Sequence, residues 1–449
     1  MTKQIALEEE AIPKLMWQYC IPAIVGMLVQ TFYNIIDRIF VGHIPKVGNL
    51  ALTGVGVTLP MMTFILGMSL LFGTGTRSLV SLWLGSNKKQ QAEKMLGTMV
   101  TSAFVTSLFI MAAGLISLKP LLYLFGANDQ TYPYAKDFMR IIFLSTPINM
   151  VGFTLNKVIS ADGNPKIAMY SQFLGAGLNI LLDPIFIFGL QLGVSGAAVA
   201  TSLSQTVVLI WVLHYFTRNP KRTMTLYWRN LAWKFPLFRR MTSIGLSAFF
   251  IQLATSVVQM ISNQELHHYG GELSIGAMTI IQSISLVFIQ PVIGLNQGIQ
   301  PIIGYNYAKG LHSRVRLVMK LAIQIGTVWV TLGWLLILGV PQVIIQLFTN
   351  SMAMEQIAIV GVRLFLGMLC VDGFQLIVSN YYQAIGNVKR SIFLSVLRQW
   401  VLLIPLMLLL PHFLGVNGIW ISGSISDFIA FIVTFFFFKK TRCEYNNVE

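Results

Sequence analysis

The sequence predicts an all-α polytopic membrane protein with twelve transmembrane helices in two six-helix lobes related by an internal parallel repeat. Of its 449 residues, 55% are hydrophobic and only 10% are charged, whereas about 25% are charged in a soluble protein. Apolar runs of about 20 residues, the length that crosses a bilayer as a helix, recur along the whole chain. In addition, segments of the second half resemble segments of the first half at a nearly constant spacing.

The expected spans are apolar runs separated by short polar breaks. The first six cover residues 13–42, 51–83, 95–118, 133–159, 165–189 and 194–217. After a polar, basic and aromatic connection, six more cover 237–266, 273–308, 317–340, 354–384, 391–411 and 416–438. This connection, the longest one, divides the chain into an N-terminal lobe (1–217), a linker (218–236) and a C-terminal lobe (237–449).

Lysine and arginine indicate the orientation in the membrane. With the N-terminus in the cytoplasm, nearly all loop cations lie inside, and the outside loops hold little beyond Lys46 and Lys119. Because cytoplasmic loops are enriched in these residues, we expect a multi-pass protein of the cell inner membrane with both termini cytoplasmic. The same distribution accounts for the net charge of +15, so no nucleic acid partner is expected.

The two halves repeat each other at a shift of 222 or 223 residues. The paired segments are GNLALTGVG at Gly48 with GELSIGAMT at Gly271, LFGAN at Leu124 with LFTNS at Leu347, DGNPK at Asp162 with IGNVK at Ile385, and LGVSGAAVA at Leu192 with LGVNGIWIS at Leu414. Each half has an even number of helices, so both halves enter the membrane in the same direction. Two like-oriented bundles around a central cavity are typical of transporters that work by rocking of the halves.

Several expected helices carry polar residues at helical spacing, which places each set on one face. Examples are Gln30, Asn34 and Asp37 in the first helix, Ser145, Asn149 and Asn156 in the fourth, and Gln172, Asn179 and Asp183 in the fifth. Amides in such positions usually form contacts between helices. An ionised carboxylate at membrane depth is costly, however, and normally faces an aqueous pathway.

Asp37, Asp183 and Thr201 share one expected depth. Counting about 1.5 Å per residue from the helix ends places them roughly 8–11 Å below the outer surface, with Asn179 one turn deeper. Two carboxylates, an amide and a hydroxyl suit a proton or a hard monovalent cation, and carboxylates that lie close together favour reversible protonation. The sequence therefore predicts a cation site in the N-terminal lobe.

The C-terminal half lacks counterparts of these two acids, because Met260 and Pro405 occupy the corresponding positions. That half has Glu265 and Asp372, which are second-lobe candidates for a cation site. In the first helix, Arg38 is either an anchor that extends to the interface or a counter-ion to a carboxylate or headgroup.

The segment GLNQGIQPIIGYNY in the eighth expected helix predicts a hinge. Pro291 and Pro301 remove helix hydrogen bonds, and the nearby glycines loosen packing. A helix of this kind can bend when the two lobes rock. The residues expected at the substrate cavity and its hinge are Gln30, Asn34, Pro291, Asn296, Gln297 and Gln300.

The sequence shows no motif for catalysis, for a metal or for a nucleotide. Gly73-Thr-Gly75 lacks the strand context of a dinucleotide loop, and Cys20, Cys370 and Cys443 have no disulfide or metal spacing. We therefore expect no enzymatic activity, no metal and no cofactor apart from a coupling ion.

Four segments together resemble the multidrug and toxic compound extrusion (MATE) transporters over nearly the full length. They are YNIIDRIFVG from Tyr33, NILLDPIF from Asn179, the GNP of ADGNPK, and QGIQPIIGYNY from Gln297. The prokaryotic branch with aspartates in helices 1 and 5 is the most similar. The resemblance implies twelve helices in two six-helix lobes, and efflux of organic, often cationic, compounds driven by inward H⁺ or Na⁺.

The resemblance also implies binding residues. By position, the N-lobe cation site consists of Asp37, Asn179, Asp183 and Thr201, with Asn156 nearby. Another branch of the family places its cation site on a helix 7 glutamate and a helix 10 aspartate, which Glu265 and Asp372 resemble. The sequence leaves the choice between the two lobes open.

The expected function is secondary active multidrug efflux, with small organic cations or drugs and the lipid bilayer as partners of a monomer. One alternative is a lipid-linked saccharide or lipid flippase, which would have a cavity rich in Arg and Lys. The few mid-span basic residues, Arg38, Arg77, Lys157 and Arg398, argue against it. A membrane enzyme, the other alternative, would need a catalytic cluster at an interface.

Overall fold

The computed structural model describes residues 7–42, 44, 48–125, 127–346 and 352–446. Some side chains in these ranges are not described, among them those of Asn34, Arg38 and Cys443. The predictions for these three side chains therefore lie outside the described residues. The described residues are almost entirely helical.

Among the described residues, the N-terminal half contains six helical segments of membrane length. Their bounds lie within three residues of the expected ones, except that α4 begins six residues earlier than expected. The segments are α2 (Ile12–Gly42), α3 (Gly48–Gly85), α4 (Lys89–Ile116), α6 (Tyr132–Ile159), α7 (Pro165–Pro184) continued by the π-helix η1 (Ile185–Gly189), and α8 (Val194–Arg218). A short helix, α5 (Leu118–Leu124), connects α4 with α6.

The C-terminal half begins with α9 (Phe235–Ala308), which holds two spans, Phe235–Gly271 and Leu273–Ala308. The chain turns between them at Gly271, whose φ of 68° is a conformation that favours glycine. The remaining elements are α10 (His312–Gly339), α11 (Pro341–Gln346), α12 (Met352–Phe365), α13 (Leu369–Ala384), α14 (Val388–Val396), η3 (Leu397–Leu403), α15 (Ile404–Leu409), α16 (Pro411–Leu414) and α17 (Val416–Asn446).

Within the described residues, eleven helices are long and apolar enough to cross a membrane. The pair Met354–Phe365 and Leu369–Ala384 passes the same test together, with a bend of 49° between its members. This pair covers the expected span 354–384, so counting it as one span gives the predicted twelve.

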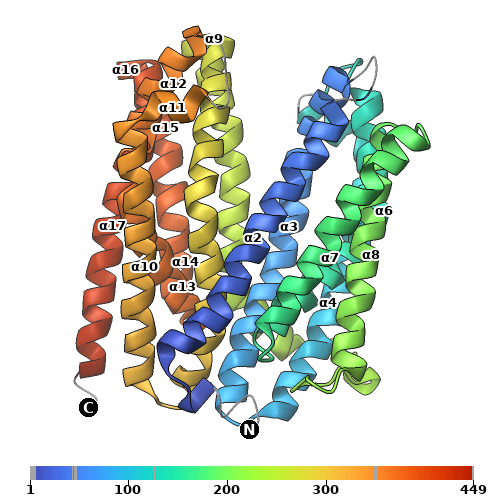
Figure 1. Ribbon diagram of the computed structural model, residues 1–449, viewed down its shortest axis with the longest axis vertical. Helices are drawn as coiled ribbons and strands as arrows, with labels where there is room; N and C mark the ends of the chain where they lie inside the picture. Colours follow the sequence, from blue (N-terminus) through green and yellow to red (C-terminus); the bar gives the residue numbers. More distant parts are fainter. Residues whose placement is uncertain (1–6, 43, 45–47, 126, 347–351, 447–449) are drawn as a thin grey trace.

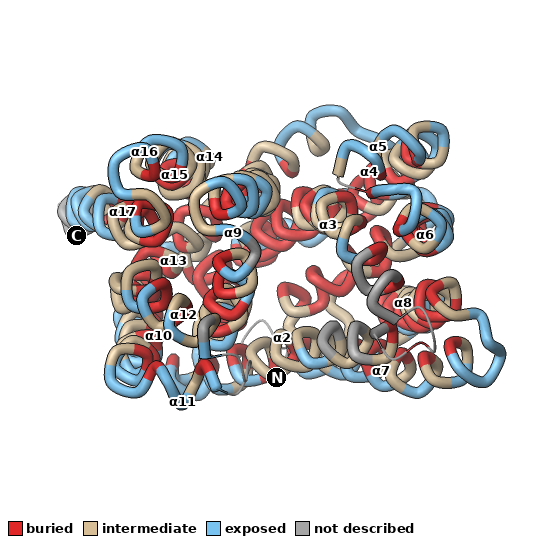
Figure 2. The backbone as a smooth tube through the Cα atoms, turned by 90° about the horizontal axis from the view of Figure 1, so that it is seen from above, coloured by how far each residue is buried: buried red, intermediate tan, exposed pale blue. Residues whose placement is uncertain are grey.

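The helices form two bundles that lie side by side. Figure 1 shows α2–α8 in one bundle and α9–α17 in the other, meeting near the two termini and spreading apart toward the opposite end. From above, the exposed residues gather on the outer rim and the buried ones on the inward sides of the helices (Figure 2). Large apolar side chains such as Phe109 and Ile116 are 73% and 84% exposed, which fits a rim that faces lipid.

The backbone confirms the internal repeat at particular glycines. Gly193 before α8 and Gly415 before α17 have φ/ψ values of 56°/−130° and 58°/−139°. Gly163 and Gly386, which are 223 residues apart, also share a positive φ, of 91° and 74°. Because residues other than glycine rarely adopt these conformations, equivalent turns connect equivalent helices in the two lobes.

At the end that carries the termini, helices of the two lobes approach each other closely, because glycines lie at the points where these helices cross. An added Cβ on Gly245 of α9 would lie 1.8 Å from the Leu71 carbonyl oxygen of α3, and one on Gly75 would lie 2.2 Å from that of Met241. Small residues allow this approach of backbones within a membrane. We call this contact the lobe seam; it comprises Cys20, Ile24, Leu71 and Gly75 on one side and Met241, Gly245, Gly294 and Gly298 on the other.

Gly245→Ala is therefore expected to destabilise the packed seam. The added methyl group meets backbone, which cannot rotate away, and overpacking of this kind costs roughly 1–3 kcal/mol. Gly177→Ala is the matched control, because nothing lies within 4 Å of an added Cβ at this exposed position of α7. Thermal unfolding in detergent should show a lower Tm for the first variant only. Equal Tm values for the two variants would contradict the close approach.

The linker is attached to the N-terminal lobe through Asp162. This buried carboxylate accepts hydrogen bonds from the Tyr215 hydroxyl at 2.5 Å and from the backbone N–H groups of Thr223 and Met224 at 2.9 and 2.8 Å. Asn164 Nδ2 donates to the Lys221 carbonyl oxygen at 2.9 Å. The DGNPK segment therefore fixes the path of the chain between the lobes.

Candidate functional site

The structure brings together the residues expected at the N-lobe cation site. Asn179 and Asp183 lie one turn apart on α7, and both side chains are buried. Asn179 Nδ2 donates to Asp183 Oδ1 at 3.2 Å and to Thr201 Oγ1 of α8 at 3.3 Å. The π-helix η1 begins two residues after Asp183, and such distortions are frequent at functional sites.

Asp37 of α2 completes this cluster. Its carboxyl group lies within hydrogen-bonding range of the Asp183 carboxyl group. Both groups are acceptors when ionised, so the contact can become a hydrogen bond only when a proton lies between them. Asp183 Oδ2 and Asn179 Oδ1 are buried without a hydrogen-bond donor among the described residues. Since buried oxygens are normally satisfied, this set of oxygens can hold a proton or a small hard cation.

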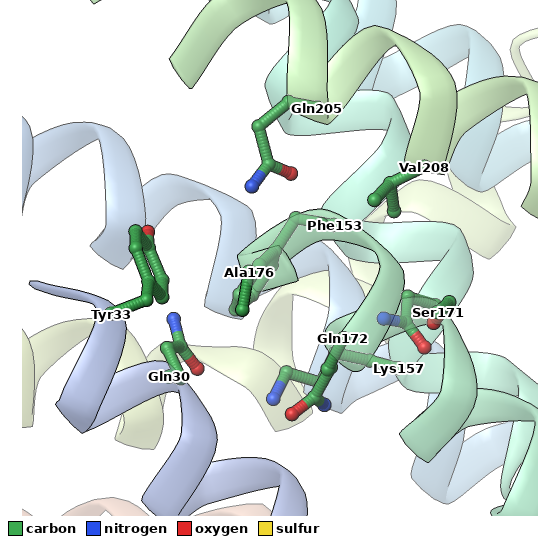
Figure 3. A pocket seen from close by; sticks show the side chains of 11 residues that line it. Gln30, Tyr33, Phe153, Lys157, Ser171, Gln172, Ala176, Gln205 and Val208 are labelled. Carbon is green, nitrogen blue, oxygen red and sulfur yellow. The ribbon is translucent and has the colours of Figure 1, made fainter. Parts of the chain in front are cut away.

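A small cavity lies within the N-terminal lobe between α2, α6, α7 and α8. Its volume is about 50 Å³, which is space for a few water molecules. Figure 3 shows its labelled side chains, which include Gln30, Tyr33, Lys157, Gln172 and Gln205. Two of the residues expected at the cation site and the substrate cavity, Gln30 and Asn156, line the cavity. Tyr33 lines the cavity and precedes Asp37 by one turn of α2, so the cavity lies next to the carboxylate pair.

Lys157 belongs both to this cavity and to the contact between the lobes. Its Nζ donates to Gln297 Oε1 of α9 at 3.0 Å and lies 4.8 Å from the centre of the Phe153 ring. Arg77 of α3 is buried and donates from Nε to the Lys157 carbonyl oxygen at 3.1 Å and from Nη1 to the Gln297 carbonyl oxygen at 3.2 Å. We call Arg77, Lys157 and Gln297 the polar latch, since they join the two lobes.

In the C-terminal lobe, Asp372 lies in an ion-pair triad with two buried carboxylates and a half-buried arginine. Arg398 of η3 donates from Nε to Asp427 Oδ1 at 2.5 Å and from Nη2 to Asp372 Oδ2 at 3.2 Å. The two aspartates are 2% and 4% exposed. The structure thus brings Asp372 together with Arg398 and Asp427, and Glu265 is not among its partners in the described part of the chain. The Arg398 guanidinium group already neutralises part of the negative charge that would attract a coupling cation.

Comparison with known proteins identifies the family. The MatE family model matches residues 22–185 and 248–409, which is more than half of the chain. The chain belongs to the MATE family. It is accordingly a multi-pass membrane transporter and not an enzyme.

Relatives of this MATE chain match it over nearly its whole length. The multidrug export protein MepA of Staphylococcus haemolyticus is 26% identical over 435 residues, which cover 95% of this chain and 94% of the relative. The solved structure of the MATE multidrug transporter DinF-BH has a TM-score of 0.90, 33% identity and 97% coverage of both chains. A structure described as the outward-facing conformation of a MATE family transporter has a TM-score of 0.91, 25% identity and 98% coverage of both chains.

The residues expected at the substrate cavity and its hinge in the eighth span do not lie together at the N-lobe cavity. Asn296 donates to the Leu376 carbonyl oxygen at 3.2 Å inside the C-terminal lobe and does not line the cavity. Gln300 bonds to Ser78 Oγ of α3 at 2.7 Å across the contact between the lobes. Pro291 and Pro301 lie within helical backbone, because Gly271 is the residue with non-helical angles in α9. Bending at these prolines stays a prediction.

The sequence patterns did not assign Tyr33, Gln205 or Lys157 to the functional site. Tyr33 precedes Asp37 by one turn and shares its face of α2, a spacing that could have identified it. Gln205 of α8 follows Thr201 by one turn in the same way. Lys157 was counted only as a mid-span cation, because its partner Gln297 is 140 residues away in the sequence.

The two buried carboxylates of the triad in this MATE chain predict a large stability effect for Arg398→Met. The substitution leaves Asp372 and Asp427 buried without their counter-ion, and breaking a buried pair in this way costs about 3–5 kcal/mol. Thermal unfolding should show a strongly lowered Tm. Adding Asp372→Asn and Asp427→Asn removes the orphaned charges and should restore much of the loss. An unchanged Tm for Arg398→Met would show that the triad contributes no net stability.

Proposed function

We propose that this multidrug efflux transporter of the MATE family exports organic, often cationic, compounds in antiport with H⁺ or Na⁺. The coupling cation would bind in the N-terminal lobe among Asp37, Asn179, Asp183 and Thr201. The observation that carries this proposal is the Asp37–Asp183 pair, in which two carboxyl groups face each other and no described residue gives Asp183 a positively charged partner. A proton or a cation between them would relieve their repulsion.

The C-terminal lobe supports a coupling site less well. Asp372 has Arg398 as a fixed counter-ion and Asp427 as a companion. A cation that entered this triad would have to compete with a guanidinium group held by two carboxylates, one of them at 2.5 Å. In contrast, Asp183 Oδ2 and Asn179 Oδ1 in the N-terminal lobe are buried acceptors without a hydrogen-bond partner among the described residues.

We further propose that the transporter is a monomer in the cell inner membrane with both termini in the cytoplasm. In that orientation the lobe seam and the polar latch close the cytoplasmic end, and the bundles diverge toward the outside (Figure 1). The conformation would then be outward-facing. The similarity to a MATE structure described as outward-facing supports this assignment.

The proposed cycle follows from differential affinity, which any coupled transporter needs. In the inward-open state the carboxylate pair is free of its coupling cation, and an organic cation enters between the lobes. Gln30, Gln172 and Tyr33, which line the N-lobe cavity, would offer it amide and aromatic contacts once this cavity widens. After the lobes rock outward, H⁺ or Na⁺ binds at Asp37 and Asp183 and removes the negative charge that held the substrate. The substrate then leaves to the outside.

The flippase alternative is weaker on the described residues. A pyrophosphate headgroup would require several cations around the cavity, yet Lys157 is the only charged residue among the described ones that line it. Its Nζ is also engaged by Gln297.

Dye efflux from vesicles, driven by an H⁺ or a Na⁺ gradient in separate experiments, tests the proposal. Asp37→Asn and Asp183→Asn should each abolish gradient-driven efflux, whereas Asp372→Asn should keep it in proportion to the amount of folded protein. Full efflux from both N-lobe variants would show that the coupling site lies elsewhere. Loss with Asp372→Asn alone would assign it to the C-terminal lobe.

A further inference from the structure

A larger cavity lies in the C-terminal lobe, outside the cation site and the polar latch. It is a groove of about 750 Å³, within the range of about 300–1,000 Å³ that small-molecule sites occupy. The helix α13 packs against both α10 and α17 and contributes Phe374 and Tyr381 to the groove. Figures 1 and 2 show α10 and α17 on the side of this lobe that faces away from the N-terminal lobe. The groove therefore borders the surrounding bilayer.

One wall of the groove is a polar stripe on α10. His312, Arg316, Lys320 and Gln324 recur every fourth residue and line the groove together, as the helical repeat requires. The stripe starts at the first residue of α10, on the side of the molecule that carries the termini, and extends roughly 18 Å along the helix axis. Lys439 of α17 adds a further cation. No acidic residue is among the described residues that line the groove.

The rest of the groove is apolar and aromatic. Phe374 of α13 packs against Phe435 and Phe438 of α17, with ring centres 6.2 and 5.8 Å apart. Phe435 remains 46% exposed, and Ile323 of α10 lines the same groove as these rings. A basic end near the membrane interface thus continues into an apolar trough that runs toward the membrane interior.

We propose that this groove binds one anionic phospholipid, with its phosphate headgroup at Arg316, Lys320 and Lys439 and an acyl chain along Ile323, Phe374 and Phe435. Basic pockets between transmembrane helices bind anionic headgroups by charge, and the acyl chain gains apolar contact. The three cations, with no acid among the described lining residues, make the groove unfavourable for an organic cation. The occupant is therefore a membrane component and not an exported compound.

Native mass spectrometry of the purified full-length transporter tests this proposal with phosphatidylglycerol and phosphatidylcholine of identical acyl chains. Phosphatidylglycerol should bind at one copy per protein and at least about tenfold more tightly than phosphatidylcholine. Arg316→Gln with Lys320→Gln and Lys439→Gln should weaken this binding on the order of 100-fold, since each cation contributes about fivefold. The control carries Lys88→Gln, Lys166→Gln and Arg218→Gln, three cations of the N-terminal lobe outside the groove, and should bind normally.

A second variant, Ile323→Trp, keeps every charge and fills the apolar trough. It should also lose bound phosphatidylglycerol, which separates a seated lipid from diffuse attraction to a basic surface. Equal binding of the two lipids, equal loss in the control triple variant, or normal binding by Ile323→Trp would each overturn the proposal.

Discussion

Replacing Asp183 by asparagine should abolish the dependence of substrate binding on the coupling cation. Asparagine keeps the shape of the side chain and can still bond to Asn179, but it carries no charge and binds no proton. Coupling between two ligands typically changes affinity by about 5–150-fold, and this factor should fall to one. Titration of a fluorescent substrate into purified protein at several pH values or Na⁺ concentrations measures it directly.

Two further variants make this test specific. Asp37→Asn should give the same result as Asp183→Asn, because each carboxyl group needs the other to share a cation. Asp137→Asn removes an exposed acid at the start of α6 and should leave the cation dependence intact. A normal cation dependence in Asp183→Asn would remove this residue from the coupling mechanism.

Replacing Arg77 by methionine should open the end of the molecule that carries the termini. The variant leaves the carbonyl oxygens of Lys157 and Gln297 without the guanidinium donor that each has in the latch. An unsatisfied buried group costs about 1–3 kcal/mol, and a loss of about 3 kcal/mol shifts a two-state equilibrium by more than about 100-fold. Gln297 lies across the seam from Arg77, so the cost at its carbonyl oxygen falls on the conformation with a closed seam. The population should therefore shift toward the state that is open at this end.

Spin labels at Ser86 and Lys389, two residues on opposite lobes at this end, can measure the shift. The native cysteines Cys20, Cys370 and Cys443 must first be replaced by alanine. Distances between the labels should lengthen in Arg77→Met and stay short in Arg140→Met, which removes an exposed arginine of α6. Identical distance distributions in both variants would mean that the polar latch does not hold the lobes together.

Much of the fold could be predicted because it depends on local composition and on the repeat. The equivalent turns at Gly193 and Gly415 lie where the repeated segments placed them. The cluster of Asn179, Asp183 and Thr201 was also accessible, since helical spacing and membrane depth fix the relative positions of residues on adjacent antiparallel helices.

The contacts between distant segments could not be predicted in the same way. Nothing in the spacing of Arg398 and Asp427 indicates that they enclose Asp372, because helix rotation and the π-helix η3 decide which faces meet. Likewise, the pairing of Lys157 with Gln297 depends on how the lobes are placed relative to each other. Sequence patterns describe faces of single helices, whereas these pairings arise from packing.

Counting the protons or Na⁺ ions released when substrate binds tests the central claim most directly. In weakly buffered detergent solution, a pH indicator or a Na⁺ electrode should detect about one cation released per substrate bound, since two close carboxylates share one charge. Release should vanish in Asp37→Asn and Asp183→Asn and persist in Asp372→Asn. Undiminished release from Asp183→Asn, or release lost only in Asp372→Asn, would contradict a coupling site in the N-terminal lobe.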